Sequence, residues 1–134
     1  MEYFCGTDII EVERIKKAIL ETERFKEEIF TETEIENGNK KSEKVMFEYY
    51  AGRFAAKEAI YKAVSKIKSD FNFWEVEILN DKENKNRPVV IFKNTELRDM
   101  QKSGMISIDV SISHISNFAT ATAIAKLRKN CDLT

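Results

Sequence analysis

The sequence predicts an α+β domain in which helices pack on one face of a mainly antiparallel sheet. Two observations favour this class. Apolar residues recur at helical spacing in the first half of the chain, and in the second half they alternate with polar residues. Helices that come first and strands that come second are typical of segregated layers rather than of repeated βαβ units.

In the first half, an apolar start at 3–5, with Ile9 and Ile10 beyond, indicates a first strand that leads into Gly6-Thr7-Asp8. Helical spacing follows through Val12, Ile15, Ile19 and Leu20, and again through Phe25, Ile29 and Phe30. Thr31 and Glu34 match a capping box and predict a short helix. A polar loop at 36–42 should then precede a long helix over 43–67.

In the second half, alternation predicts strands at 73–79 and 106–113, and the chain's only proline, Pro88, opens another at 89–92. A charged turn at 81–87 separates the strand at 73–79 from the strand at 89–92. Gly104 closes a short helix over 95–102. The final strand, 118–125, places four alanines on one face, where a helix or another subunit can approach closely. No repeat or linker interrupts 1–134, so we expect one domain.

Composition narrows the classes of function. The chain has 134 residues, 22 basic against 23 acidic side chains and a formal net charge of -1. A duplex nucleic-acid binder usually has a basic excess, so nucleic acid is a poor partner. No apolar run approaches the roughly 18 residues of a membrane helix. Cys5 and Cys131 are the only cysteines, which suits a reducing cytoplasm.

Glu58 is the residue that most needs an explanation. It lies among aromatic residues that recur at helical spacing, namely Phe47, Tyr50, Phe54 and Tyr61. A carboxylate on such a stripe must be paired, hydrogen-bonded or bound to a metal. An ordinary ion pair with Lys62, four residues on, is one interpretation. The other is a site for phosphoryl chemistry, in which Arg53, Lys57 and Lys62 surround the carboxylate with positive charge.

Asp8 is the second carboxylate of interest. It follows the first strand and Gly6, so it could face Glu58 from a strand end, and two carboxylates suit a hard ion such as Mg²⁺. Asp8 and Glu11 also fit a capping box for the first helix, and spacing alone does not choose between these interpretations.

The only histidine, His114, ends a strand and falls by alternation on its Ile/Val face, while Ser111 and Ser113 lie on the other. This segment lacks the glycines of a nucleophile elbow, so we exclude a serine hydrolase. Arg14 and other basic residues on the first helices are offset by glutamates, and alone they indicate a solvated face.

These residues together resemble a known family, the holo-[acyl-carrier-protein] synthases, which are the short bacterial class of 4'-phosphopantetheinyl transferases. Four blocks carry the resemblance in order, at 6–15, 24–31, 51–62 and 110–114. The block at 51–62 (AGRFAAKEAIYK) is similar to the family's signature, and it occurs once, as in the homotrimeric short class. Asp109 stands where the family commonly has histidine, and Asn86-Arg87-Pro88 replaces a usual Gly-Lys-Pro.

The resemblance implies the 4'-phosphopantetheinyl transferase fold and a Mg²⁺-dependent reaction that serves fatty acid biosynthesis. In it, 4'-phosphopantetheine moves from coenzyme A to a serine of apo-acyl carrier protein, and adenosine 3',5'-bisphosphate is released. It implies that Asp8 and Glu58 hold Mg²⁺ and that Lys62 stabilises charge in the transition state or, if its pKa is depressed, deprotonates the serine; we favour the first.

It further implies that Arg53, Ser113 and His114, with Lys62, bind coenzyme A, that Arg14 contacts the carrier protein, and that sites lie between subunits of a homotrimer. The residues alone leave two rivals, a non-catalytic module that binds a nucleotide or carrier protein and a carboxylate-metal phosphohydrolase. They do not distinguish Mg²⁺ from Mn²⁺.

Overall fold

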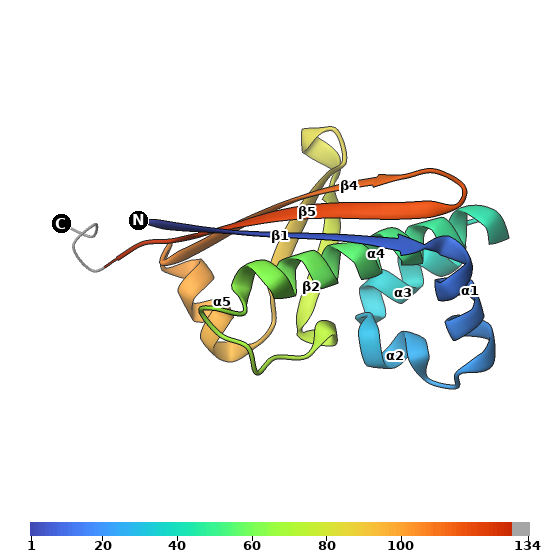
Figure 1. The fold of residues 1–134 in the computed structure, drawn as a ribbon, viewed down its shortest axis with the longest axis horizontal. Coiled ribbons are helices and arrows are strands. Elements are labelled where there is room, and N and C mark those ends of the chain that lie inside the picture. The colour runs from blue at the N-terminus through green and yellow to red at the C-terminus, as the bar shows by residue number, and fades with distance from the viewer. Residues whose placement is uncertain (130–134) are drawn as a thin grey trace.

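A computed structural model describes residues 1–129 and has five α-helices and two antiparallel sheets in this range. The larger sheet has the order β1 (Glu2–Glu11), β5 (Phe118–Leu127), β4 (Ile106–His114), and the smaller is a hairpin of β2 (Val76–Asp81) and β3 (Arg87–Phe92). The helices are α1 (Val12–Glu21), α2 (Phe25–Ile29), α3 (Glu32–Asn39), α4 (Glu43–Val64) and α5 (Thr95–Lys102). All of them lie on one side of the larger sheet (Figure 1), which confirms the α+β prediction.

The long helix α4 is the centre of the fold. On its sheet side, small residues meet small residues: the four alanines of β5 are at most 1% exposed, and Ala55, Ala59 and Ala63 of α4 are fully buried. The partner of the alanine row is therefore the protein's own helix, and the alternative of another subunit at this face is wrong. Small side chains let the helix axis lie close to the strands.

On its other side, α4 packs against larger apolar residues. Tyr50, Ile60 and Val64 are fully buried, and the core around Ile60 and Val64 includes Ile78, Phe92 and Leu97 from the hairpin and α5. A second core cluster joins the first turns of α1 to α4 through Val12, Ile15 and Phe47. Both cores therefore hold α4 firmly, and its side chains can serve as a rigid platform.

Several element boundaries differ from the predictions. The predicted loop at 36–42 is mostly helical, because α3 continues to Asn39 after the capping box of Thr31 and Glu34, which is present. The predicted strand at 73–79 begins as a 3₁₀ turn, Phe73–Glu75, in which the amide and the side chain of Asn72 donate hydrogen bonds to Glu75 Oε1. The long helix ends at Val64, three residues before the predicted end at 67.

The outer face of the larger sheet is open. Its large apolar side chains, Tyr3, Ile9, Phe118 and Ile124, are between 42% and 68% exposed, and no element of residues 1–129 covers them. In that same range no helix is both long enough and apolar enough to cross a membrane. Cys5 is a free, exposed cysteine, and Cys131 lies outside the described residues.

Candidate active site

Strand β1 and helix α4 touch at Gly6. A Cβ atom at this position would lie 2.0 Å from the carbonyl oxygen of Ala59 and 2.8 Å from the amide nitrogen of Ala63, so only glycine fits. Asp8 lies two residues further along the strand and points to the same side. The backbone contact at Gly6 therefore brings the Asp8 carboxylate to the part of α4 that carries Glu58 and Lys62.

Asp8 and Lys62 form an ion pair although they are far apart in the sequence. The Lys62 Nζ lies 3.3 Å from Asp8 Oδ1 and donates a hydrogen bond to the carbonyl oxygen of Thr7 at 2.9 Å. Glu58 has no hydrogen bond or ion pair with any residue of 1–129. The interpretation of Glu58 and Lys62 as an ion pair within the helix is therefore wrong, because Lys62 reaches across to the strand.

The structure excludes one of the two interpretations of Asp8, the helix cap. Asp8 lies inside β1, opposite Ala121, and not at a strand end as predicted. The N-cap residue of α1 is Glu11, whose side chain makes no capping bond. Asp8 is thus not a helix cap, and its carboxylate is available to the charged cluster on α4.

Glu58 sits in an unfavourable electrostatic environment. Burial raises the pKa of its carboxyl group, the Asp8 carboxylate raises it further, and the Lys62 ammonium opposes both effects. The carboxylates of Asp8 and Glu58 repel each other. The Lys62 ammonium lies near both, but it contacts only Asp8. The cluster of Asp8, Glu58 and Lys62 therefore has an excess negative charge and an unpaired carboxylate.

This donor set fits a magnesium ion. Proteins usually bind Mg²⁺ through one or two carboxylates, and the remaining ligands are water and substrate phosphates. Within residues 1–129 no three His, Cys, Asp or Glu side chains gather as a complete metal site. Asp8 and Glu58 could hold such an ion only with phosphate or water oxygens as further ligands, as in a site that handles phosphates.

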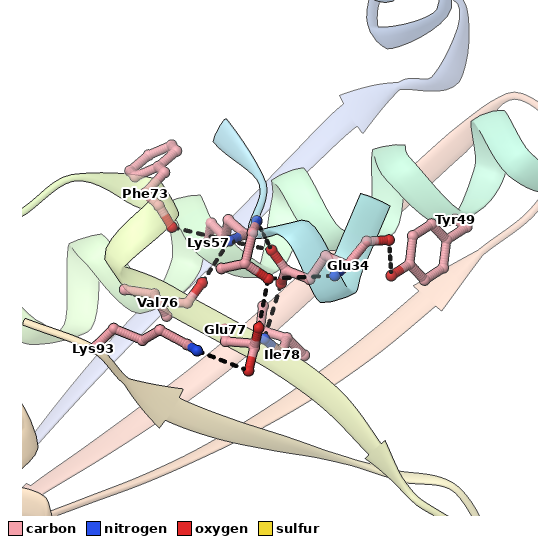
Figure 2. Close-up of polar contacts among 9 residues, drawn as sticks. Glu34, Tyr49, Lys57, Phe73, Val76, Glu77, Ile78 and Lys93 are labelled. Atoms are coloured by element: carbon pink, nitrogen blue, oxygen red, sulfur yellow. Dashed lines mark hydrogen bonds and ion pairs between the residues drawn. The ribbon is translucent and has the colours of Figure 1, made fainter. Parts of the chain in front are cut away.

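Of the three cations predicted around Glu58, only Lys62 is there. Lys57 points to the other side of α4, where its Nζ lies 2.7 Å from Glu34 Oε1 and donates to the carbonyl oxygens of Phe73 and Val76 (Figure 2). Arg53 is five residues before Glu58, which places it about 140° around the helix. The prediction that Arg53 and Lys57 surround Glu58 is wrong.

The Lys57 side belongs to a buried polar network that the sequence did not reveal (Figure 2). Glu34 is fully buried and accepts hydrogen bonds from the amides of Thr31 and Ile78 in addition to its ion pair. The Thr31 hydroxyl donates to Glu77 at 2.6 Å, and Lys93 lies 3.5 Å from the other oxygen of Glu77. Burial lowers the pKa of Lys57, and the Glu34 carboxylate opposes that shift. The network fastens α4 to α3 and β2.

Arg53 faces the hairpin. Its guanidinium stacks on Tyr49 at 4.7 Å from the ring centroid and donates to Asn80 Oδ1 at 3.0 Å. The Nε atom is buried and has no hydrogen-bond partner. A buried donor without an acceptor is costly, so this group is one that an anionic or carbonyl acceptor would stabilise.

Ser113 and His114 lie on opposite faces of β4, as alternation predicts. Ser113 is exposed on the open face, whereas His114 lies on the helix side with its Nδ1 3.8 Å from Glu48 Oε2. Glu48 precedes Glu58 by ten residues, which is about 15 Å along α4. The structure therefore does not bring Ser113 or His114 into contact with the cluster of Asp8, Glu58 and Lys62.

Arg14 is exposed on α1 and makes no hydrogen bond or ion pair with residues 1–129. The two departures from the family pattern lie against each other: Arg87 Nη2 donates to Asp109 Oδ2 at 2.6 Å. This exposed pair links the hairpin to β4, so Asp109 is engaged with Arg87.

Comparison with known proteins agrees with the fold. The chain belongs to the 4'-phosphopantetheinyl transferase superfamily, whose model matches residues 4–123. The matched span includes Asp8, Glu58 and Lys62.

Individual relatives are more specific. The chain is 43% identical over 125 residues to a holo-[acyl-carrier-protein] synthase of Thermoanaerobacter sp. (strain X514), an alignment that covers 93% of this chain and 88% of the relative. It is 44% identical over 119 residues to the enzyme of that name from Fusobacterium nucleatum, with 89% and 94% covered. A holo-(acyl-carrier-protein) synthase from Bacillus anthracis, solved in complex with CoA (3',5'-ADP), superposes with a TM-score of 0.75 at 32% identity and covers 93% of this chain and 96% of its own.

Proposed function

We propose that this chain is a holo-[acyl-carrier-protein] synthase whose reaction takes place at Asp8, Glu58 and Lys62. It transfers 4'-phosphopantetheine from coenzyme A to a serine of apo-acyl carrier protein and releases adenosine 3',5'-bisphosphate. The observation that carries the assignment of the site is the 3.3 Å contact that joins Asp8 of β1 to Lys62 of α4, beside the unpaired Glu58.

Asp8 and Glu58 are the residues we assign to Mg²⁺, because their carboxylates repel each other and only Asp8 contacts an ammonium. When bound, Mg²⁺ would neutralise charge on the coenzyme A pyrophosphate and polarise the phosphorus that is attacked. The rigid packing of α4 keeps Glu58 in place, and Gly6 keeps Asp8 close to it.

Lys62 acts through its charge. In the transfer, the serine oxygen forms a bond to phosphorus while the bond between that phosphorus and the bridging oxygen breaks, and negative charge grows on the departing phosphate. The Lys62 Nζ lies beside the Asp8 carboxylate and the Thr7 carbonyl oxygen, so its positive charge is placed to stabilise that growing negative charge. This supports the electrostatic role rather than that of a base.

Arg53, Ser113 and His114 are the residues we assign to the nucleotide end of coenzyme A, and Lys62 to its phosphates. Arg53 offers a buried donor without a partner, and Ser113 is exposed on the open face of the sheet. Because Arg53, Ser113 and His114 do not meet the cluster of Asp8, Glu58 and Lys62 within one chain, we assign sites to the junctions of a homotrimer. The open sheet face with its four exposed apolar side chains supports contact between subunits.

Arg14 is the residue we assign to the carrier protein, since it is exposed and unpaired among the described residues. Holo-carrier protein would then serve fatty acid biosynthesis in the cytoplasm.

The test of the activity is direct. The protein is incubated with coenzyme A, Mg²⁺ and an apo-acyl carrier protein, and the carrier is weighed by mass spectrometry. We expect a gain of one phosphopantetheine on the carrier. Cleavage of coenzyme A without that gain would indicate a hydrolase, and no change in either substrate would indicate a binding module.

A second test concerns the assembly. Glu58→Gln and His114→Ala proteins, each inactive alone, are unfolded together and refolded as mixed oligomers. If Glu58 and His114 act from neighbouring subunits, some junctions receive two intact halves and part of the activity returns. No recovery would place both residues on one chain, and a monomer by light scattering would remove the premise.

A further inference from the structure

Lys62 has an unexpected partner. It stands four residues after Glu58 on α4, in the order that favours an ion pair along a helix. Its Nζ instead lies 3.3 Å from Asp8 and 2.9 Å from the Thr7 carbonyl oxygen, both on β1. The Lys62 ammonium thus forms an ion pair with Asp8, one of the two carboxylates assigned to the metal, and leaves Glu58 unpaired.

The ammonium is also placed so that it can leave. The Asp8 side chain is 17% exposed, whereas the Lys62 side chain is 51% exposed, so Lys62 approaches the carboxylate from the solvent side. Ion pairs with an exposed partner contribute little to stability, so breaking the pair between Lys62 and Asp8 costs little free energy. A long, flexible lysine side chain that loses this contact remains near the site and can reach another anion.

We propose that Lys62 is an internal counter-ion that occupies Asp8 until a divalent cation displaces it, and that this displacement frees Lys62 for the phosphates of the substrate. The inference rests on the assignment of Asp8 and Glu58 as metal ligands under the proposed function. It has a consequence that a purely catalytic lysine lacks: removing Lys62 tightens metal binding while it slows transfer.

The first test measures binding of Mn²⁺ alone, without coenzyme A, by counting the free ion with electron paramagnetic resonance. We expect Lys62→Gln to bind Mn²⁺ about three- to fivefold more tightly, which corresponds to about 1 kcal/mol at most for a partly exposed ion pair. Lys66→Gln is the matched control. Lys66 follows Lys62 by four residues and also lies against β1, with its Nζ 5.9 Å from the Phe4 ring centroid. It makes no contact with Asp8.

Lys66→Gln should change Mn²⁺ affinity by less than about 1.5-fold, because exposed charges without contact are screened by salt. Equal tightening in the two variants would show general repulsion and overturn the proposal, as would unchanged or weaker Mn²⁺ binding in Lys62→Gln.

The second test observes the lysine itself. In protein labelled at lysine side chains, titration with diamagnetic Mg²⁺ should shift the Lys62 signal, and the Asp8→Asn protein should show the shifted signal before Mg²⁺ is added. A Lys62 signal that stays in place through Mg²⁺ saturation contradicts displacement.

Asp8→Asn and Glu58→Gln separate this inference from the function on which it rests. If both variants bind Mn²⁺ as well as the unmodified protein, the metal assignment itself is wrong. If both lose Mn²⁺ binding and Lys62→Gln gains none, only the role of Lys62 as counter-ion fails.

Discussion

Two neighbouring residues of α4, Lys57 and Glu58, take part in opposite kinds of charged cluster. On one side, Lys57 and Glu34 are at most 1% exposed, and every charged atom has a partner. On the other side, Glu58 is half-buried and unpaired, while Asp8 depends on a half-exposed Lys62. One helix thus carries a completed polar network and an incomplete one.

The comparison shows that a polar cluster that stabilises the fold differs from one that can bind a ligand. A buried ion pair with all its hydrogen bonds made fixes positions, and it leaves no atom for a ligand. An unpaired carboxylate beside another carboxylate is unfavourable until a cation arrives, and this leaves binding energy available to a ligand. The Glu34 network holds the helix on which Glu58 and Lys62 are displayed.

The largest effect we expect is on the satisfied side. Lys57→Met leaves Glu34 as a buried, unpaired charge and should lower the free energy of unfolding by about 3–5 kcal/mol. Urea denaturation measures it, with exposed Lys66→Met as control within about 0.5 kcal/mol. Adding Glu34→Gln to Lys57→Met should recover part of the loss, because glutamine keeps an acceptor without the charge. A Lys57→Met protein as stable as its parent would show that the network is not what holds α4.

The next effect is on the incomplete side. Glu58→Gln keeps the shape but removes one metal ligand charge, so transfer should fall at least about a hundredfold, which is about 2.7 kcal/mol in the barrier. The free energy of unfolding should stay the same or rise, since repulsion with Asp8 is removed. Initial rates and urea curves are measured together, with Glu43→Gln at the start of α4 as control. Normal transfer with reduced stability would make Glu58 structural.

A smaller effect concerns alkaline pH and again belongs to the Glu34 side. Burial raises the pKa of Tyr50 above its usual 10.0, as it does for Tyr49, whose hydroxyl donates to the Glu34 carbonyl oxygen. Above pH 10 the unfolded chain loses these protons before the folded one does, so stability should fall as pH rises. The slope for Tyr50 is at most about 1.4 kcal/mol per pH unit. Tyr50→Phe should flatten it in urea titrations at pH 9 to about 11; an unchanged slope would assign it to other groups.

The smallest effect is at the surface. Arg14→Glu should raise the KM for the carrier protein about fivefold and leave that for coenzyme A nearly unchanged, because a rim charge steers an acidic macromolecule. Lys102→Glu is the same charge reversal on α5, at the far end of the molecule from α1 (Figure 1), and should change neither KM. Parallel changes in both constants for Arg14→Glu would indicate a folding defect instead.

Local patterns predicted much of the fold. The capping box at Thr31 and Glu34, the helix over 95–102 and the alternation through Ile106 and Val110 all appear as expected, since each depends on neighbours a few residues away. The prediction that a strand starts at Phe73 is wrong. The chain first forms a 3₁₀ turn over Phe73–Glu75, in which the Asn72 amide donates to the Glu75 carboxylate.

The site was less predictable because its contacts are long-range. Periodicity placed Glu58 on a helix but could not show that Lys62 pairs with Asp8, or that Lys57 turns to Glu34. Spacing allowed Asp8 to face Glu58 and Lys62 to lie beside it, and the resemblance to a family assigned these three residues to one site. One signal was available: Lys57 shares a helical stripe with Tyr50, Ile60 and Val64, where a cation requires a partner.

The contact at Gly6 also determines how β1 can align during folding. A slip of one residue would turn the strand over and place Thr7 or Cys5 against α4, and a slip of two would bring Phe4 or Asp8 to the point where a Cβ lies 2.0 Å from a carbonyl oxygen. Each misaligned strand therefore meets a steric clash with the backbone of α4. Only one alignment is accepted, and it is the one in which Asp8 faces Lys62.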